Sequence, residues 1–115
     1  MFQGTVIDGK KIGRTLGYPT ANLDISVKDT KCNPGVYAGN ATLKRKKYNC
    51  AIVLHSLSDK VEVYLFDYTG PEFYGEILMV DPIQKVSEIE SQDNENDLKM
   101  KIESDIALVR KVLKI

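Results

Sequence analysis

Five short runs of β-forming residues, separated by turn-forming residues, constrain the fold of this chain more than any other feature. Each run is rich in Val, Ile, Tyr or Phe, and clusters of Gly, Pro, Asp or Lys lie between the runs. The runs are residues 2–7, 35–43, 48–54, 61–66 and 77–80. The pattern predicts an all-β body in which turns such as the basic segment 44–47 are solvated tips, with a phosphate-binding patch as the alternative for 44–47.

The end of the chain predicts a helix that follows a polar connection. After Pro82 the composition changes, and residues 87–97 are acidic and polar enough for a mobile connection. Beyond it, apolar residues recur at steps of three and four, which predicts an amphipathic helix over about 96–114, capped by Asn94 or Asn96. Its apolar stripe is expected to pack against the β body and consists of Leu98, Ile102, Ile106, Val109 and Leu113.

Size and charge limit the classes of protein that this chain can represent. A chain of 115 residues with 43% hydrophobic content predicts one domain over residues 1–115, with its barrel over about 1–82. Its 16 basic residues balance its 16 acidic residues, so we expect a small-molecule ligand, no nucleic acid and no membrane. Without a signal peptide or an apolar run of roughly 20 residues, the default is a cytoplasmic protein, expected as a monomer. Cys32 and Cys50 are interpreted as structural.

The segment Gly13-Arg-Thr-Leu-Gly-Tyr-Pro-Thr-Ala-Asn22 is the strongest candidate for ligand binding. Gly13 and Gly17 allow backbone N–H groups to approach an anion closely. Thr20 and Asn22 are two residues apart, so in an extended segment a hydroxyl and an amide face the same way, toward one magnesium-bound phosphate group. An ordinary turn that leads into a strand is the alternative.

A Walker A loop is excluded for this segment, because Tyr18 and Pro19 stand where that motif needs its lysine and its hydroxyl. Pro19 instead fixes the backbone just before Thr20 and limits the directions in which the hydroxyl can point.

Glu62 is the candidate general base. Strict alternation over 61–67 places Glu62 on one face with the rings of Tyr64 and Phe66. Partial burial there disfavours the ionised form of a carboxylate and suits it to accept a proton, whereas an exposed strand face is the alternative. His55, the single histidine, is left out of the site because a lone histidine at a strand end commonly makes a local hydrogen bond.

Five motifs follow one another along roughly residues 4–80. They are Gly4-Thr-Val6, Gly13-Arg-x-Leu-Gly-Tyr-Pro-Thr-Ala-Asn-Leu23, Pro34-Gly-Val-Tyr-Ala38, Val61-Glu-Val-Tyr-Leu65 and Phe73-Tyr-Gly75. In these motifs and their order the sequence resembles the ATP-dependent riboflavin kinases. The resemblance implies a six-stranded antiparallel Greek-key barrel with a C-terminal α-helix.

The same resemblance implies an activity and a role for each site residue. ATP would phosphorylate the ribityl 5′-hydroxyl of riboflavin to give FMN and ADP, with Glu62 accepting the hydroxyl proton. Mg²⁺ would bind with ATP at Thr20 and Asn22, and the chain alone is not expected to make FAD. The implied nucleotide-binding residues are Gly13, Arg14, Gly17, Tyr18, Pro19, Thr20 and Asn22.

Two segments depart from the family pattern. The connection 55–60 is shorter than in family members, and Gln84 stands where an arginine is expected. A non-catalytic flavin- or nucleotide-binding or regulatory module, or a kinase for another acceptor, therefore remains as an alternative.

Overall fold

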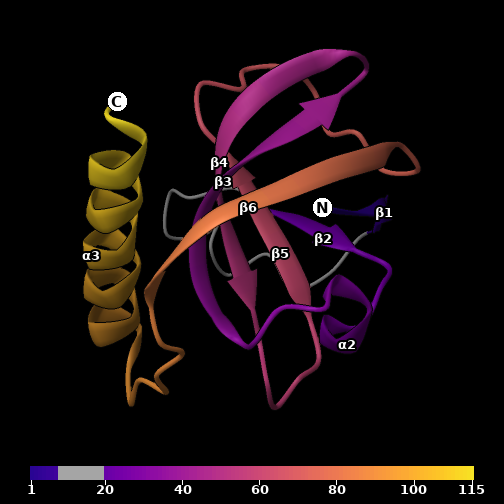
Figure 1. Cartoon of the computed structure of the whole chain (residues 1–115). Coiled ribbons are helices and arrows are strands. Elements are labelled where there is room, and N and C mark those ends of the chain that lie inside the picture. The colour runs from indigo at the N-terminus through magenta and orange to yellow at the C-terminus, as the bar shows by residue number, and fades with distance from the viewer. Residues whose placement is uncertain (8–19) are drawn as a thin grey trace.

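A computed structural model of the chain describes residues 1–7 and 20–115, and these form a closed antiparallel barrel with a long C-terminal helix (Figure 1). The strands pair in the order β1-β2-β5-β4-β3-β6, and β6 closes the barrel on β1. This arrangement confirms the predicted all-β class, the six-stranded barrel and the C-terminal helix. The strands are β1 (Phe2–Ile7), β2 (Ala21–Leu23), β3 (Gly35–Leu43), β4 (Lys46–Leu54), β5 (Val61–Leu65) and β6 (Ile77–Ser87); the helices are α2 (Val27–Thr30) and α3 (Glu95–Leu113).

Alternation along the strands separates the barrel interior from its outer face. On β5, Val61, Val63 and Leu65 are buried in the interior core, as the alternation predicts. Tyr64 lies on the other face and packs with Phe66 in a second apolar cluster, which contains α3 residues. The helix α3 therefore packs over part of the outer face of β5.

β6 continues beyond the predicted end at residue 80. It runs to Ser87 because the ladder with β3 shifts register between Ala38 and Gly39, where Gly39 lies opposite Pro82. A bulge of this kind accommodates a proline that a regular ladder would exclude. A Cβ on Gly39 would lie only 2.5 Å from the Asp81 carbonyl oxygen, so the two strands approach closely there.

Two short elements precede β3 and were not among the predicted segments. β2 has three residues and α2 has four. The backbone N–H of Ser26 donates to the Asp29 carboxylate, and that of Val27 donates to Asp59 Oδ1 at 2.8 Å. The second bond attaches the start of α2 to the 55–60 connection.

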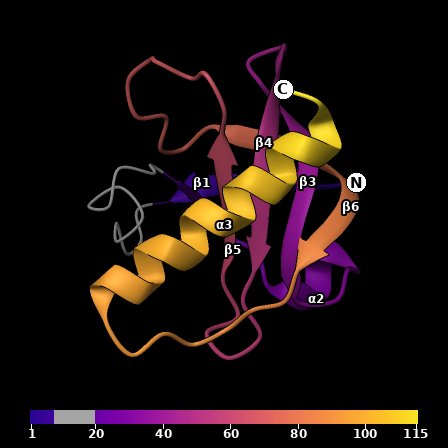
Figure 2. The ribbon, with the colours of Figure 1, turned by 90° about the vertical axis from the view of Figure 1, so that its left-hand side faces the viewer.

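Helix α3 lies across the outer face of the barrel, over β3, β4 and β6 (Figure 2). Val109 is fully buried, and Ile106 and Leu113 pack beside it against the barrel. The guanidinium of Arg110 lies 4.6 Å from the centroid of the Phe66 ring. The C-terminal half of the predicted apolar stripe is thus the half that the barrel covers.

The bounds of the C-terminal segments differ somewhat from the expected ones. The connection between β6 and α3 spans residues 88–94, and α3 begins at Glu95 with Asn94 as its N-cap. Within the described residues, no helix has the length and apolar character needed to span a membrane. That residues 1–115 form a single domain stays a prediction.

Candidate functional site

Two cavities adjoin Thr20. The α3 cavity, of about 410 Å³, lies between the outer face of the barrel and α3. The Tyr68 cavity, of about 350 Å³, lies between the barrel and the loop 68–74. Thr20 lines both of them. Cavities of this size typically accept small organic ligands.

The α3 cavity has mainly apolar walls. The first half of the α3 stripe, Leu98 and Ile102, faces this space, whereas the second half packs on the barrel. Opposite the helix, Val53 and Tyr64 contribute from β4 and β5. Unlike a fully packed helix face, this part of α3 leaves room for a flat apolar group.

Glu62 lines the α3 cavity and contacts Thr20. The Thr20 hydroxyl donates to Glu62 Oε2 at 3.3 Å, and the Glu62 side chain is 19% exposed. Of the two alternatives for this strand face, the structure therefore has the partly enclosed carboxylate. The hydrogen bond between Thr20 and Glu62 joins two residues that are 42 positions apart in sequence.

Asn22 is placed by the pairing of β2 with β5. It lies opposite Glu62 in the ladder and is 8% exposed. Cross-strand partners share a face of the sheet, so the amide is close to the carboxylate. Of Thr20 and Asn22, only Thr20 is among the described residues that line the cavities. The metal-binding role predicted for this pair stays a prediction.

His55 lies beside Glu62, although the sequence argument left it out of the site. Its Nε2 is 2.8 Å from Glu62 Oε1. The contact is not aligned as a hydrogen bond, and Nε2 is buried without an aligned partner among the described residues. Glu62 thus has His55 at one oxygen and Thr20 at the other.

The connection 55–60 borders the α3 cavity as a short, anchored turn. The backbone N–H of His55 donates to the Lys60 carbonyl at 3.0 Å, and Asp59 caps α2. At its tip, Leu57 is 95% exposed and lines the cavity mouth. The shortened connection is therefore an ordered rim of the cavity.

Three aromatic rings stiffen the wall of the Tyr68 cavity. Tyr68 packs edge-on against Tyr48 and Phe73, with ring centroids 5.7 and 5.0 Å apart. The Tyr68 hydroxyl donates to the Pro71 carbonyl at 2.5 Å. These contacts fix the segment 68–71 against the barrel.

The other predicted residues are distributed as follows. The described residues contain no cluster of three or more His, Cys, Asp or Glu side chains suited to a metal. Gln84 is exposed on β6, opposite Ala38. Both cysteines are free thiols, and burial raises the pKa of Cys50 to about 12. Gly13, Arg14, Gly17, Tyr18 and Pro19 lie outside the described residues, and their nucleotide-binding role stays a prediction.

Known proteins are similar to this sequence over nearly its full length. Residues 1–113 match the family model described as Riboflavin kinase. An RNA-binding riboflavin kinase of Bacillus subtilis is 33% identical in an alignment of 118 positions, which covers 96% of this chain and 50% of that protein. A bifunctional riboflavin kinase/FMN adenylyltransferase of Buchnera aphidicola is 35% identical over 99% of this chain and 39% of its own length. The chain thus spans half or less of these curated relatives.

Solved structures share the fold. A structure described as a macrolide-efflux protein from Streptococcus pneumoniae superposes with a TM-score of 0.77 and 27% identity, over 94% of this chain and 37% of that one. A riboflavin kinase from Trypanosoma brucei superposes with a TM-score of 0.72 and 23% identity, over 97% and 75% of the two chains. The comparison with the Trypanosoma brucei protein shows that the two chains share a fold.

Proposed function

The chain belongs to the riboflavin kinase family, and from this premise we propose that it transfers the γ-phosphate of ATP to the ribityl 5′-hydroxyl of riboflavin. One observation carries the proposal. Thr20 lines both cavities and touches Glu62, so a phosphate donor on one side of Thr20 and an acceptor on the other would meet beside a carboxylate. That juxtaposition is what an in-line phosphoryl transfer requires.

The acceptor belongs in the α3 cavity, because Glu62 lines it. The apolar walls from α3 and β4 suit a flat ring system, and the polar end near Glu62 and His55 suits a hydroxyl group. The nucleotide is assigned to the Tyr68 cavity, which Thr20 also lines, because Thr20 directly follows the predicted nucleotide-binding segment 13–19 in sequence. Riboflavin has two features that complement the α3 cavity, a ring system and a terminal hydroxyl.

Glu62 acts as general base in this reaction. The acceptor oxygen forms a bond to the γ-phosphorus, the bond from that phosphorus to the β–γ bridging oxygen breaks, and ADP leaves. The proton of the hydroxyl passes to Glu62, whose partly enclosed carboxylate reaches into the cavity. The low exposure of this carboxylate also limits competition from water for the same proton.

Magnesium fits the oxygen groups at the centre of the site. The Thr20 hydroxyl and the Asn22 amide supply oxygen ligands of the kind that Mg²⁺ prefers. Bound with ATP, the ion would neutralise charge on the terminal phosphates. The Thr20 hydroxyl would then leave Glu62 and turn toward the phosphates, and Oε2 of Glu62 would lose its present partner.

We restrict the proposal to the kinase reaction. The Bacillus subtilis relative is described as RNA-binding, but this chain spans 50% of that protein and has a formal net charge of zero. A balanced charge gives no electrostatic support for a phosphate backbone. The partners proposed here are riboflavin, FMN, ATP and ADP.

Formation of FMN by the purified chain tests the proposal directly. Riboflavin, ATP and Mg²⁺ are incubated with the chain, and FMN is separated by chromatography with fluorescence detection. Glu62→Gln is expected to lower kcat by about 10²- to 10⁴-fold while riboflavin affinity changes little. Glu76→Gln, at a carboxylate that is 44% exposed and outside the cavity linings, is the matched control. Riboflavin binding without FMN formation would instead establish a non-catalytic binding module.

Thr20 is tested by a pair of variants. Thr20→Ala is expected to raise the KM for MgATP, whereas Thr20→Ser keeps the hydroxyl and is expected to restore it. Equal magnesium and ATP dependence in all three proteins would contradict the role assigned to Thr20.

A further inference from the structure

Lys101 of α3 has an unusually complete set of partners. Its Nζ donates to Ser87 Oγ at 2.7 Å, to the Glu88 carbonyl at 3.0 Å, and to both carboxylate oxygens of Asp105 at 2.8 and 2.7 Å. A lysine ammonium has three donor hydrogens, so protein groups occupy all of them. Although Lys101 lines the α3 cavity, it has no donor left for a ligand.

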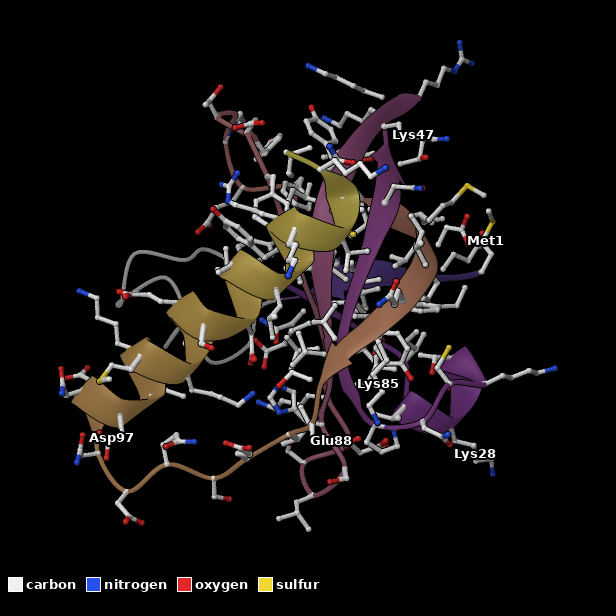
Figure 3. All side chains as sticks on the ribbon, turned by 60° about the vertical axis from the view of Figure 1, so that its left-hand side comes forward. Met1, Lys28, Lys47, Lys85, Glu88 and Asp97 are labelled. Carbon is white, nitrogen blue, oxygen red and sulfur yellow. The ribbon has the colours of Figure 1, made fainter. Side chains whose placement is uncertain are left out.

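These bonds connect α3 to the place where β6 ends. Glu88, the first residue of the 88–94 connection, is bonded through its carbonyl to Lys101 and through its carboxylate to Lys85, at 2.7 Å. Figure 3 labels Lys85 and Glu88 at this end of β6, and Asp97 in the first turn of α3, with the connection running between them. Residues 88–91 line the α3 cavity. Lys101 therefore holds one wall of the cavity to another.

Stability alone does not explain this arrangement. An exposed Lys–Asp pair four residues apart on a helix contributes little. Here the side chains are only 15% and 12% exposed, and a buried pair bears a desolvation cost that an apolar pair would avoid. What an apolar pair cannot supply is the hydrogen bonds to Ser87 and Glu88.

We propose that Lys101 is a positioning residue for the acceptor, which fixes the 88–91 wall of the α3 cavity relative to Glu62. Asp105 orients Lys101 for this role by binding it from the adjacent turn of the helix. The inference rests on the proposed riboflavin kinase function. It assigns Lys101 an effect on acceptor binding and none on the nucleotide, because Lys101 lines the α3 cavity and the Tyr68 cavity is formed by other residues.

Steady-state kinetics separate the two substrates. Lys101→Met is expected to raise the KM for riboflavin about tenfold and to leave the KM for ATP within about twofold. Lys111→Met removes the same charge from an exposed position of α3 and serves as the matched control. Hydrogen exchange of residues 88–94 is expected to accelerate in Lys101→Met and to stay unchanged in Lys111→Met.

A double variant distinguishes positioning from general stability. Lys101→Met with Asp105→Leu removes the whole ion pair and is expected to unfold at the same urea concentration as the wild type or a higher one. Positioning by Lys101 requires that this stable double variant keep the raised KM for riboflavin and the fast exchange at 88–94. If both return to wild-type values, the pair serves stability and the proposal is overturned.

The same experiments distinguish failure of this inference from failure of the proposed function. A wild-type chain that neither binds riboflavin nor forms FMN overturns the kinase proposal and, with it, the assignment of an acceptor to this cavity. A wild-type chain that forms FMN, together with a Lys101→Met variant of unchanged exchange and unchanged riboflavin KM, overturns the role of Lys101 alone.

Discussion

Each carboxylate oxygen of Glu62 has a different neighbour, and this difference distinguishes the two oxygens in the proposed reaction. Oε1 lies 2.8 Å from His55 Nε2, and Oε2 accepts from Thr20 at 3.3 Å. The Thr20 contact is the longer one and is the one that a bound phosphate would replace. In the proposed reaction Oε2 would then face the acceptor, while His55 stays beside Oε1.

His55 is therefore expected to influence turnover through Glu62. His55→Gln keeps a polar side chain near Oε1 and is expected to hold kcat within about threefold, whereas His55→Leu replaces it with an apolar one and is expected to lower kcat about tenfold or more. The KM for ATP is expected to stay constant in both variants. Equal kcat values for the glutamine and leucine variants would contradict this role.

The two cysteines are expected to react very differently with alkylating reagents. Burial leaves Cys50 without exposed surface and raises its pKa to about 12, so its reactive thiolate is scarce at every pH below that value. Cys32 is partly exposed. At pH 8, mass spectrometry after iodoacetamide treatment is expected to show one label in the native chain and two in urea. A native Cys32→Ser variant that still takes up label would contradict the assignment.

The sequence predicts part of this site, because part of it depends on local pattern. Alternation along β5 separates Glu62 and Tyr64 from Val61, Val63 and Leu65, as the structure confirms, and the structure adds that the Glu62 face is the outer one. The contact of Glu62 with Thr20 depends on the pairing of β2 with β5, which are distant in sequence. In the sequence, Lys101 and Asp105 look like an ordinary exposed pair four residues apart on a helix. Their burial, and the bond from Lys101 to Ser87, are seen only in the folded structure.

At the scale of elements, the start of α3 depends on one side chain. Asn94 Oδ1 accepts from the backbone N–H of Asp97 at 2.8 Å, which identifies Asn94 rather than Asn96 as the cap. Asn94→Ala is expected to lower the free energy of unfolding by about 1 kcal/mol. Because Asn96 lies inside the helix, Asn96→Ala is expected to leave it unchanged or raise it slightly. Urea denaturation with equal m-values measures both, and equal losses would contradict the capping assignment.

The elements with a strong local signal are predicted well. Five strands and α3 follow from alternation and helical periodicity, whereas two short elements and one extension do not. β2 has only three residues, too few for a period. The signal for α2 is the Ser26 and Asp29 pair, a variant of the capping box. The second half of β6 contains Pro82, which in the sequence indicates the end of a strand. The strand continues in the structure because a bulge opposite Gly39 accommodates the proline.

At the scale of the molecule, the α3 cavity is formed by elements from different parts of the chain. Strands β3 to β5 provide one side, and α3 with the 88–91 segment provides the other. A ligand between them links the stability of the barrel to that of the helix. Riboflavin at 100 times its Kd is expected to raise the free energy of unfolding by about 2.7 kcal/mol.

Hydrogen exchange tests the location of that ligand. Bound riboflavin is expected to slow exchange both in residues 61–65 of β5 and in residues 98–106 of α3, because both border the cavity. The exposed turn 44–47 is the internal control and is expected to exchange at an unchanged rate. Protection of the barrel without protection of α3 would place the ligand elsewhere.

Closure of the barrel has a further consequence. Every strand in the described part of the chain has a hydrogen-bonded neighbour on both sides. An unpaired edge is what allows one sheet to recruit strands from another, and a closed barrel offers no such template. The curated relatives contain the matching region within proteins about twice as long or longer. Because its strands pair with one another in a closed circuit, this barrel can be joined to other folded units while it keeps its own strand pairing, which makes it a portable building block.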